Sequence, residues 1–122
     1  MTQKINIDEK FALFSEHFRP KIVAELNGQE FKLVKIEGSY PWHSHADADE
    51  MFFIWKGNIT LEFRTHSVEL SAGEAIVVPK GVEHRPIAHG EAQLFLIEPK
   101  ATKNNGDTKV DEKFDAPNDV WI

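Results

Sequence analysis

The sequence predicts an all-β sandwich or barrel preceded by one short N-terminal helix. Between residues 21 and 98 short apolar runs recur and glycines separate them, at Gly38, Gly57, Gly73, Gly81 and Gly90. Several short strands with frequent turn signals are typical of these β folds. We therefore expect three parts: a helical segment at 1–20, a barrel at 21–98 and a polar tail at 99–122.

The opening segment is predicted to be amphipathic and helical. Asn6 followed by Glu9 matches a capping box, and Pro20 forces the helix to stop at or before Arg19. The apolar face predicted for this helix, expected to pack on the domain or on a partner subunit, consists of Ile7, Phe11, Phe14 and Phe18.

The strand signals begin directly after this segment. Asn27-Gly28 lies between two apolar runs and is a strong hairpin signal. The segment 59–64 alternates apolar and polar residues, as a half-buried strand does. The runs predicted to be strands are Lys21–Leu26, Glu30–Ile36, Met51–Trp55, Ile59–Arg64, Ala75–Val78 and Leu94–Ile97.

The composition turns polar after Pro99, and on composition alone such a stretch is mobile. The chain then ends in the apolar cluster Val120-Trp121-Ile122, so we expect the tail to dock at its end. No repeat of 20–50 residues is seen.

Charge and cysteine content exclude several function classes. The formal net charge is −6, which disfavours nucleic acid and anionic membrane surfaces as partners. The sequence has no cysteine, so disulfides, thiolate metal sites and cysteine nucleophiles are excluded. The first residues lack the apolar core of a signal peptide, and no window has the ~18 apolar residues of a membrane span. We therefore expect a cytoplasmic protein.

One segment carries residues suited to metal binding. His43 and His45 are two positions apart, so in an extended chain both imidazoles point to the same side and can converge on one ion. Glu50 opens the apolar run 51–55, where a carboxylate needs a buried partner such as a cation. Asp47 and Asp49 are expected to be loop residues, although either could replace Glu50.

A second segment adds a third histidine. A buried strand at 75–78 ends in a Pro/Gly turn, and His84 follows that turn. If this strand lies beside the first, His84 supplies a third nitrogen ligand. The remaining histidines, His17, His66 and His89, are expected at the surface.

Together the two segments resemble the paired motifs of the cupin superfamily, G-x5-H-x-H-x3,4-E-x6-G and G-x5-P-x-G-x2-H-x3-N. The similarity covers residues 38–84, with two departures: Gly38 is one residue too close to His43, and Ala88 replaces the usual Asn. It implies a jelly-roll barrel, the cupin double-stranded β-helix, and commonly a homodimer. The implied ligands of one divalent metal ion are His43, His45, Glu50 and His84, and the implied turn positions are Gly57, Gly73, Pro79 and Gly81.

The resemblance leaves the metal and the reaction open. Three imidazoles and a carboxylate suit Fe, Mn, Ni, Co or Zn, with one or two positions free. Cupins of this kind include dioxygenases, decarboxylases and isomerases, and short ones are often described as sugar-phosphate isomerase-like or RmlC-like. Two hypotheses follow: a metal-dependent enzyme acting on a small carboxylate, enol or sugar derivative, or a non-catalytic small-ligand or metal-binding module.

The shape of the pocket is expected to separate these hypotheses. A narrow, aromatic-lined pocket that reaches the metal favours the enzyme, and one closed by Trp55 or Trp121 favours the module. Arg85 is expected at the surface, with contact to an anionic substrate as the alternative. Residues predicted to shape the mouth or line the interior are Tyr40, Trp42, Phe52, Ile54, Phe63 and Phe95, with core packing the simpler role for the last two.

Overall fold

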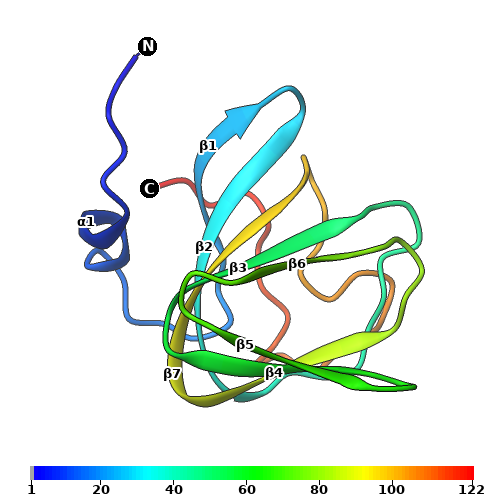
Figure 1. The fold of residues 1–122 in the computed structure, drawn as a ribbon. Helices are drawn as coiled ribbons and strands as arrows, with labels where there is room; N and C mark the ends of the chain where they lie inside the picture. Colours follow the sequence, from blue (N-terminus) through cyan, green and yellow to red (C-terminus); the bar gives the residue numbers. More distant parts are fainter. Residues whose placement is uncertain (1) are drawn as a thin grey trace.

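The computed structural model describes residues 2–122, which form one short helix and seven antiparallel strands (Figure 1). No helix in this part of the chain has the length and apolar character needed to cross a bilayer. The elements are α1 (Ile7–Phe11), β1 (Lys21–Leu26), β2 (Gln29–Ser39), β3 (Glu50–Lys56), β4 (Asn58–Phe63), β5 (Ser67–Ser71), β6 (Ala75–Val78) and β7 (His84–Pro99). The predicted all-β fold with a short N-terminal helix is confirmed.

The long strand β7 organises the barrel. Its first half pairs with β4, from His84 opposite Phe63 to Ala88 opposite Ile59. Its second half lies between β2 and β3, and β6 completes that side of the sheet. Between the halves Gly90 adopts a φ of +83°, a conformation that L side chains rarely adopt. One strand therefore contributes to both walls of the barrel.

Alternation along the strands divides the apolar residues between two cores. The barrel interior contains, among others, Ile54, Ile59, Leu61 and Leu94. A second cluster lies on the outer face, where Phe11 of α1 packs with Val23 and Leu33. Phe95 belongs to this outer cluster, so the suggestion that it lines the interior is wrong. Its neighbours Leu94 and Leu96 point inward, and alternation places Phe95 on the opposite side.

The N-terminal helix is much shorter than predicted. The Asn6 side chain accepts a hydrogen bond from the Glu9 backbone N–H, as an N-cap does, but the helix ends at Phe11. Phe18 has a φ of +60° and leaves the helical face. It packs instead inside the barrel, against Tyr40. The four-residue apolar face of the prediction is therefore split between the two cores.

The strand predictions agree with the structure, with differences in extent. Lys21–Leu26 and Ala75–Val78 have the predicted ends. Asn27 and Gly28 both have positive φ, as a two-residue type I′ hairpin requires. The predicted strand at Leu94–Ile97 is only the end of the much longer β7, and β5 was missed.

The polar tail is packed along its length rather than only at its end. Tyr40 donates a hydrogen bond to the Phe114 carbonyl oxygen, and the Phe114 ring packs against Tyr40 and Phe18. At the end of the chain, Ile22 of β1 donates its N–H to Val120 and accepts one from Ile122. In Figure 1 the tail, coloured orange to red, returns to end beside β1.

Candidate metal centre

Four buried side chains meet at one end of the barrel. His43 and His45 lie in the segment between β2 and β3, Glu50 is the first residue of β3, and His84 is the first residue of β7. The backbones of His43 and His84 pair directly, through hydrogen bonds of 3.1 and 3.0 Å. This bridge brings together the two segments that carry the candidate ligands, which is the condition under which His84 can supply a third nitrogen. All four residues are buried.

The donor atoms of the four side chains face a common centre. One ligand atom from each residue lies within 4.8 Å of the other three. Nε2 of His45 and Nε2 of His84 are each 3.4 Å from Oε1 of Glu50. Ligands placed about 2.1 Å from one ion lie about 3 to 4 Å apart. The cluster therefore fits a single transition-metal ion with little movement of the side chains.

Hydrogen bonds set the orientation of two of the imidazoles. Nδ1 of His43 lies 2.9 Å from the Pro41 carbonyl oxygen, and Nδ1 of His84 lies 2.9 Å from that of Val82. Such a bond fixes the tautomer with the proton on Nδ1 and leaves Nε2 free as a ligand.

Several donor atoms in this cluster have no hydrogen-bond partner. Nε2 of His84, Oε1 of Glu50 and both ring nitrogens of His45 are buried and unpaired. Buried polar atoms without a partner destabilise a fold. A bound cation would contact one such atom from each of His45, Glu50 and His84. This observation supports the fit of the site to a metal ion.

The electrostatic environment favours the protonation states of His43 and Glu50 that bind a cation. Burial, followed by the nearby His84, lowers the pKa of His43 from 6.5 to about 4, so its imidazole is neutral at neutral pH. Burial acts to raise the pKa of Glu50, but its close neighbours Glu98, His45 and His84 outweigh this effect and hold that pKa well below its usual range. Neutral imidazoles and an ionised carboxylate are the forms that bind metals.

Two further charged residues beside the site were not identified from the sequence. Glu98 of β7 and Lys32 of β2 are each 1% exposed, and Lys32 Nζ lies 2.9 Å from Oε1 of Glu98. Burial, together with the negative charge of Glu50, raises the pKa of Glu98 well above its usual value. A sequence signal existed, because Glu98 shares strand parity with inward-facing Leu94 and Leu96.

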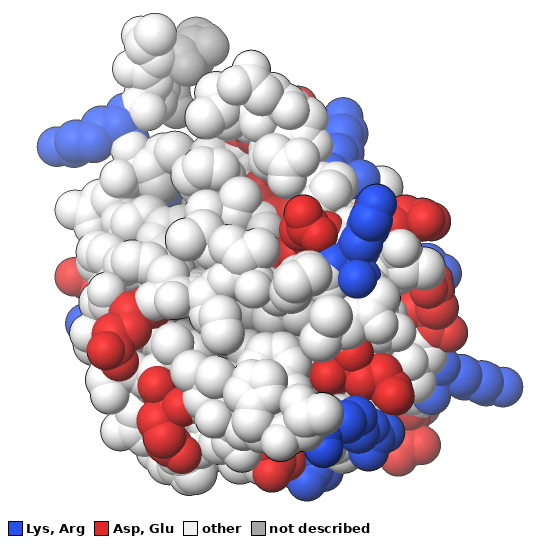
Figure 2. Space-filling model, turned by 45° about the vertical axis from the view of Figure 1, so that its right-hand side comes forward, with Lys and Arg blue, Asp and Glu red and all other residues white. Residues whose placement is uncertain are grey.

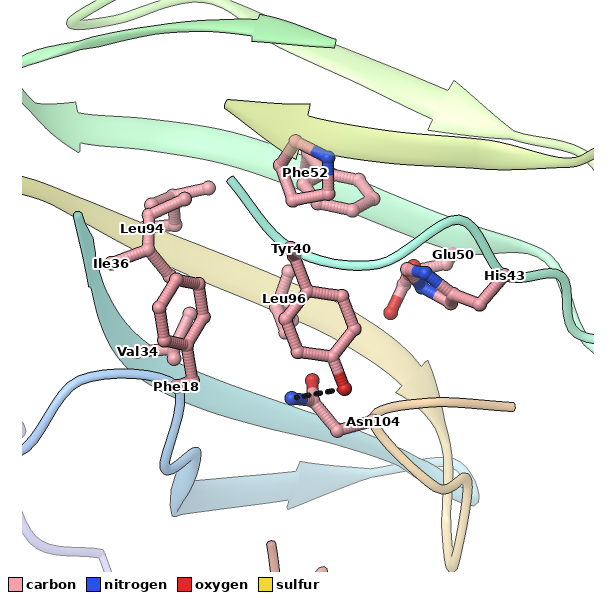
Figure 3. Close-up of a pocket in the computed structure, with 11 residues that line it drawn as sticks. Phe18, Val34, Ile36, Tyr40, His43, Glu50, Phe52, Leu94, Leu96 and Asn104 are labelled. Carbon is pink, nitrogen blue, oxygen red and sulfur yellow. Dashed lines mark hydrogen bonds between the residues drawn. The ribbon is translucent and has the colours of Figure 1, made fainter. Parts of the chain in front are cut away.

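A narrow cavity of about 30 Å³ lies beside the cluster (Figure 3). His43 and Glu50 lie on one side of it and the Tyr40 hydroxyl faces it, held by a 3.3 Å hydrogen bond from Asn104. Burial, then the charge of Glu50, raises the pKa of Tyr40, so its hydroxyl stays protonated. The remaining wall is mainly apolar and is formed by Phe18, Val34, Ile36, Phe52, Pro86, Leu94 and Leu96.

The tail lies against the outer side of the cluster. The Asp107 N–H donates to the Ser44 carbonyl oxygen, and the Ala46 N–H donates to the Asp107 carboxylate, each over 3.3 Å. A Cβ on Gly106 would come within 3.1 Å of Nδ1 of His45. The segment 106–107 therefore packs directly beside His45, one of the four donor residues.

The other candidate residues do not reach the cluster. Asp47 and Asp49 are exposed, and Asp49 accepts a hydrogen bond from the Lys80 N–H, so neither replaces Glu50. Arg85 pairs with Glu62 over 2.6 Å at the surface.

The residues predicted to shape the mouth or line the interior also differ in where they lie. Trp42 lies outside the site, beneath the guanidinium groups of Arg64 and Arg85. Phe63 packs partly against the core and stacks on His66, and Ile54 is a core residue. Tyr40 and Phe52 line the cavity as predicted.

Comparison with known proteins agrees with this geometry. The family profile Cupin_2, described as "Cupin domain", matches residues 29–98. A cupin-2 domain protein of Shewanella frigidimarina has a solved structure with 48% identity and a TM-score of 0.77, covering 78% of this chain and 93% of that one. Protein NMB1881 of Neisseria meningitidis has 36% identity and a TM-score of 0.74, covering 80% and 99%.

Two more distant relatives extend the comparison. KdgF from a Halomonas species is 26% identical with a TM-score of 0.58, over 66% of this chain and 78% of that one. The protein YdbB of Bacillus subtilis is 29% identical over 103 residues, which is 75% of this chain and 85% of the relative. With the barrel, the paired motifs and the family match in agreement, the chain belongs to the cupin family.

Proposed function

We propose that this cupin binds one divalent transition-metal ion through His43, His45, Glu50 and His84, and that it acts as an enzyme on a small carboxylate, enol or sugar derivative. The observation that carries the proposal is the set of buried, unpaired donor atoms facing one centre. A divalent ion bound there supplies Lewis-acid polarisation at its one or two open positions. Fe, Mn, Ni, Co and Zn all suit this donor set.

The residues around the ion site limit what can reach it. A cavity of about 30 Å³ holds one or two waters, or a small group of a larger molecule. The Tyr40 hydroxyl already donates to the Phe114 carbonyl oxygen and accepts from Asn104. A polar group entering the cavity would replace one of these tail contacts, whereas the apolar wall excludes further water.

The shape of the cavity favours an enzyme over a non-catalytic module. It is narrow, it carries the aromatic residues Phe18, Tyr40 and Phe52, and it reaches His43 and Glu50. Trp55 and Trp121 do not line it: Trp55 lies in the outer cluster and Trp121 is 54% exposed. The closure that would favour a binding module is therefore not made by either residue.

The test is turnover by protein loaded in turn with each of the five metals, measured with small carbonyl and carboxylate substrates and with O₂ uptake. Metal-dependent turnover that the pair His43→Ala with His45→Ala abolishes would support the proposal. The control pair His66→Ala with His89→Ala, which lies outside the cluster, should retain activity. Stoichiometric metal binding without turnover on any substrate would favour the non-catalytic module.

We also propose that the protein forms a homodimer through the outer face of the β2–β7–β3 sheet. An apolar patch there has no polar lining and consists of Phe31, Met51, Phe53, Trp55, Phe95 and Ile97. A patch without charge offers little to a charged partner, but it can pair with itself across a two-fold axis. Phe53→Lys should give a monomer by light scattering, whereas Leu13→Lys, outside the patch, should not.

The remaining partner proposals concern what the protein does not bind. On the face in Figure 2, Lys and Arg side chains are scattered among acidic and uncharged residues and form no continuous basic area. With a net charge of −6, this distribution supports the proposal that nucleic acid and anionic membranes are not partners. The ligand we propose is a small molecule that places one polar group in the cavity.

A further inference from the structure

Glu98 lies next to the proposed metal ligand Glu50 on the neighbouring strand. In the pairing of β3 with β7, Met51 lies opposite Ile97, which brings Glu50 and Glu98 together at the same end of the barrel. Both side chains are buried on the same face of these two strands, so their carboxyl groups are neighbours. Glu98 is 1% exposed, so water does not compete for this contact.

A buried lysine holds Glu98 from the other side. Lys32 Nζ lies 2.9 Å from Oε1 of Glu98 and 3.8 Å from Oε1 of Glu30. It also donates a hydrogen bond of 3.1 Å to the Thr102 carbonyl oxygen. Glu30 in turn lies opposite Glu98 in the pairing of β2 with β7. The Glu98 carboxyl is therefore fixed between Lys32 and Glu50.

Burying Lys32 and Glu98 side by side is not explained by stability alone. Buried ion pairs often contribute no more than apolar residues of similar volume, because both charges lose their hydration. Around metal sites, however, ligating carboxylates need a hydrogen-bonding partner that sets their orientation. Glu50 directs its Oε1 toward His45 and His84, and this atom has no hydrogen-bond partner of its own.

We propose that Glu98, itself fixed by Lys32, is a positioning residue that orients the Glu50 carboxylate for metal binding. The inference rests on the proposed metal site. In this proposal Glu98 acts by donating a hydrogen bond to the Glu50 carboxylate and does not contact the ion. A neutral side chain of the same shape that can still form this bond should serve equally well.

The experiment compares Glu98→Gln with Glu98→Leu. Co²⁺ is the probe, its affinity is measured by titration against a competing chelator, and its visible absorption spectrum reports the ligands. Glu98→Leu should weaken Co²⁺ binding about 10- to 100-fold and change the spectrum. Glu98→Gln should bind within about threefold of the wild-type protein with an unchanged spectrum, because the amide can donate to Glu50 and accept from Lys32.

Two further variants keep the test decisive. Lys32→Met combined with Glu98→Leu removes the buried ammonium group together with its carboxyl partner, a replacement that buried polar pairs often tolerate, and it should show the same loss if Glu98→Leu alone fails to fold. Lys35→Met is the matched control, since Lys35 lies on the same strand but donates to the Phe14 carbonyl oxygen away from the metal site. It should leave Co²⁺ binding unchanged.

The outcomes separate positioning from charge and from the metal site itself. If Glu98→Gln weakens binding as much as Glu98→Leu, or changes the spectrum, charge rather than orientation matters and the inference is overturned. Folded Leu variants that bind Co²⁺ like the wild-type protein also overturn it. If the wild-type protein binds no Co²⁺, the proposed metal site fails, and the inference fails with it.

Discussion

Acid should destabilise the metal-free protein through His43. In the folded chain the pKa of His43 is lowered from 6.5 to about 4, chiefly by burial and then by the nearby His84. Between these values the unfolded chain binds a proton that the folded chain does not, so stability falls as the pH falls. From pH 7 to pH 5 this linkage removes about 2 kcal/mol from the free energy of unfolding.

The assay is urea unfolding at pH 7 and pH 5 in the presence of a chelator. The wild-type protein should lose about 2 kcal/mol more than His43→Gln, which has no imidazole to titrate. His66→Gln, at an exposed turn residue, is the control and should follow the wild-type protein. Equal losses in the wild-type and His43→Gln proteins would refute the view that His43 is buried in its neutral form.

Three other perturbations test separate parts of the structure. Gly57→Ala should destabilise the protein by at least about 2 kcal/mol in urea unfolding, because φ is +84° and a Cβ would lie 2.8 Å from the Glu91 carbonyl oxygen; a loss below about 0.5 kcal/mol would contradict this turn geometry. Phe114→Ala should release the tail and speed proteolysis within residues 100–116, while the barrel stays intact; unchanged cleavage would show that Phe114 does not hold the tail. Co²⁺ at a hundred times its Kd should stabilise the wild-type protein by about 2.7 kcal/mol in thermal unfolding, and His45→Ala should lose this gain; an equal gain in that variant would place the ion elsewhere.

Much of the barrel was predictable because its signals are local. The Asn27-Gly28 hairpin needs only two residues with positive φ, and the structure has both. The approach of His43 to His84 was implied by the cupin resemblance, since the spacing of these histidines from the glycine and proline turn residues is similar to that of the cupin motifs. What the sequence could not provide was the direct backbone pairing between them.

The remaining features depend on contacts between distant parts of the chain. Helical periodicity placed Phe18 on the face of a helix, but packing against Tyr40 and Phe114 holds it in the barrel interior. The tail was expected to dock only at its end, because its polar composition does not reveal the contacts of Phe114. Lys32 and Glu98 are far apart in sequence and were missed, although each shares strand parity with buried apolar neighbours.

The central claim is that three imidazoles and one carboxylate converge on a single ion. X-ray absorption spectroscopy of the Co²⁺-loaded protein tests it most directly, combined with metal analysis. We expect one ion per chain, nitrogen and oxygen ligands at about 2.1 Å, and outer-shell scattering from three imidazoles. An ion with fewer than two imidazole ligands, or no bound ion after reconstitution, would contradict the claim.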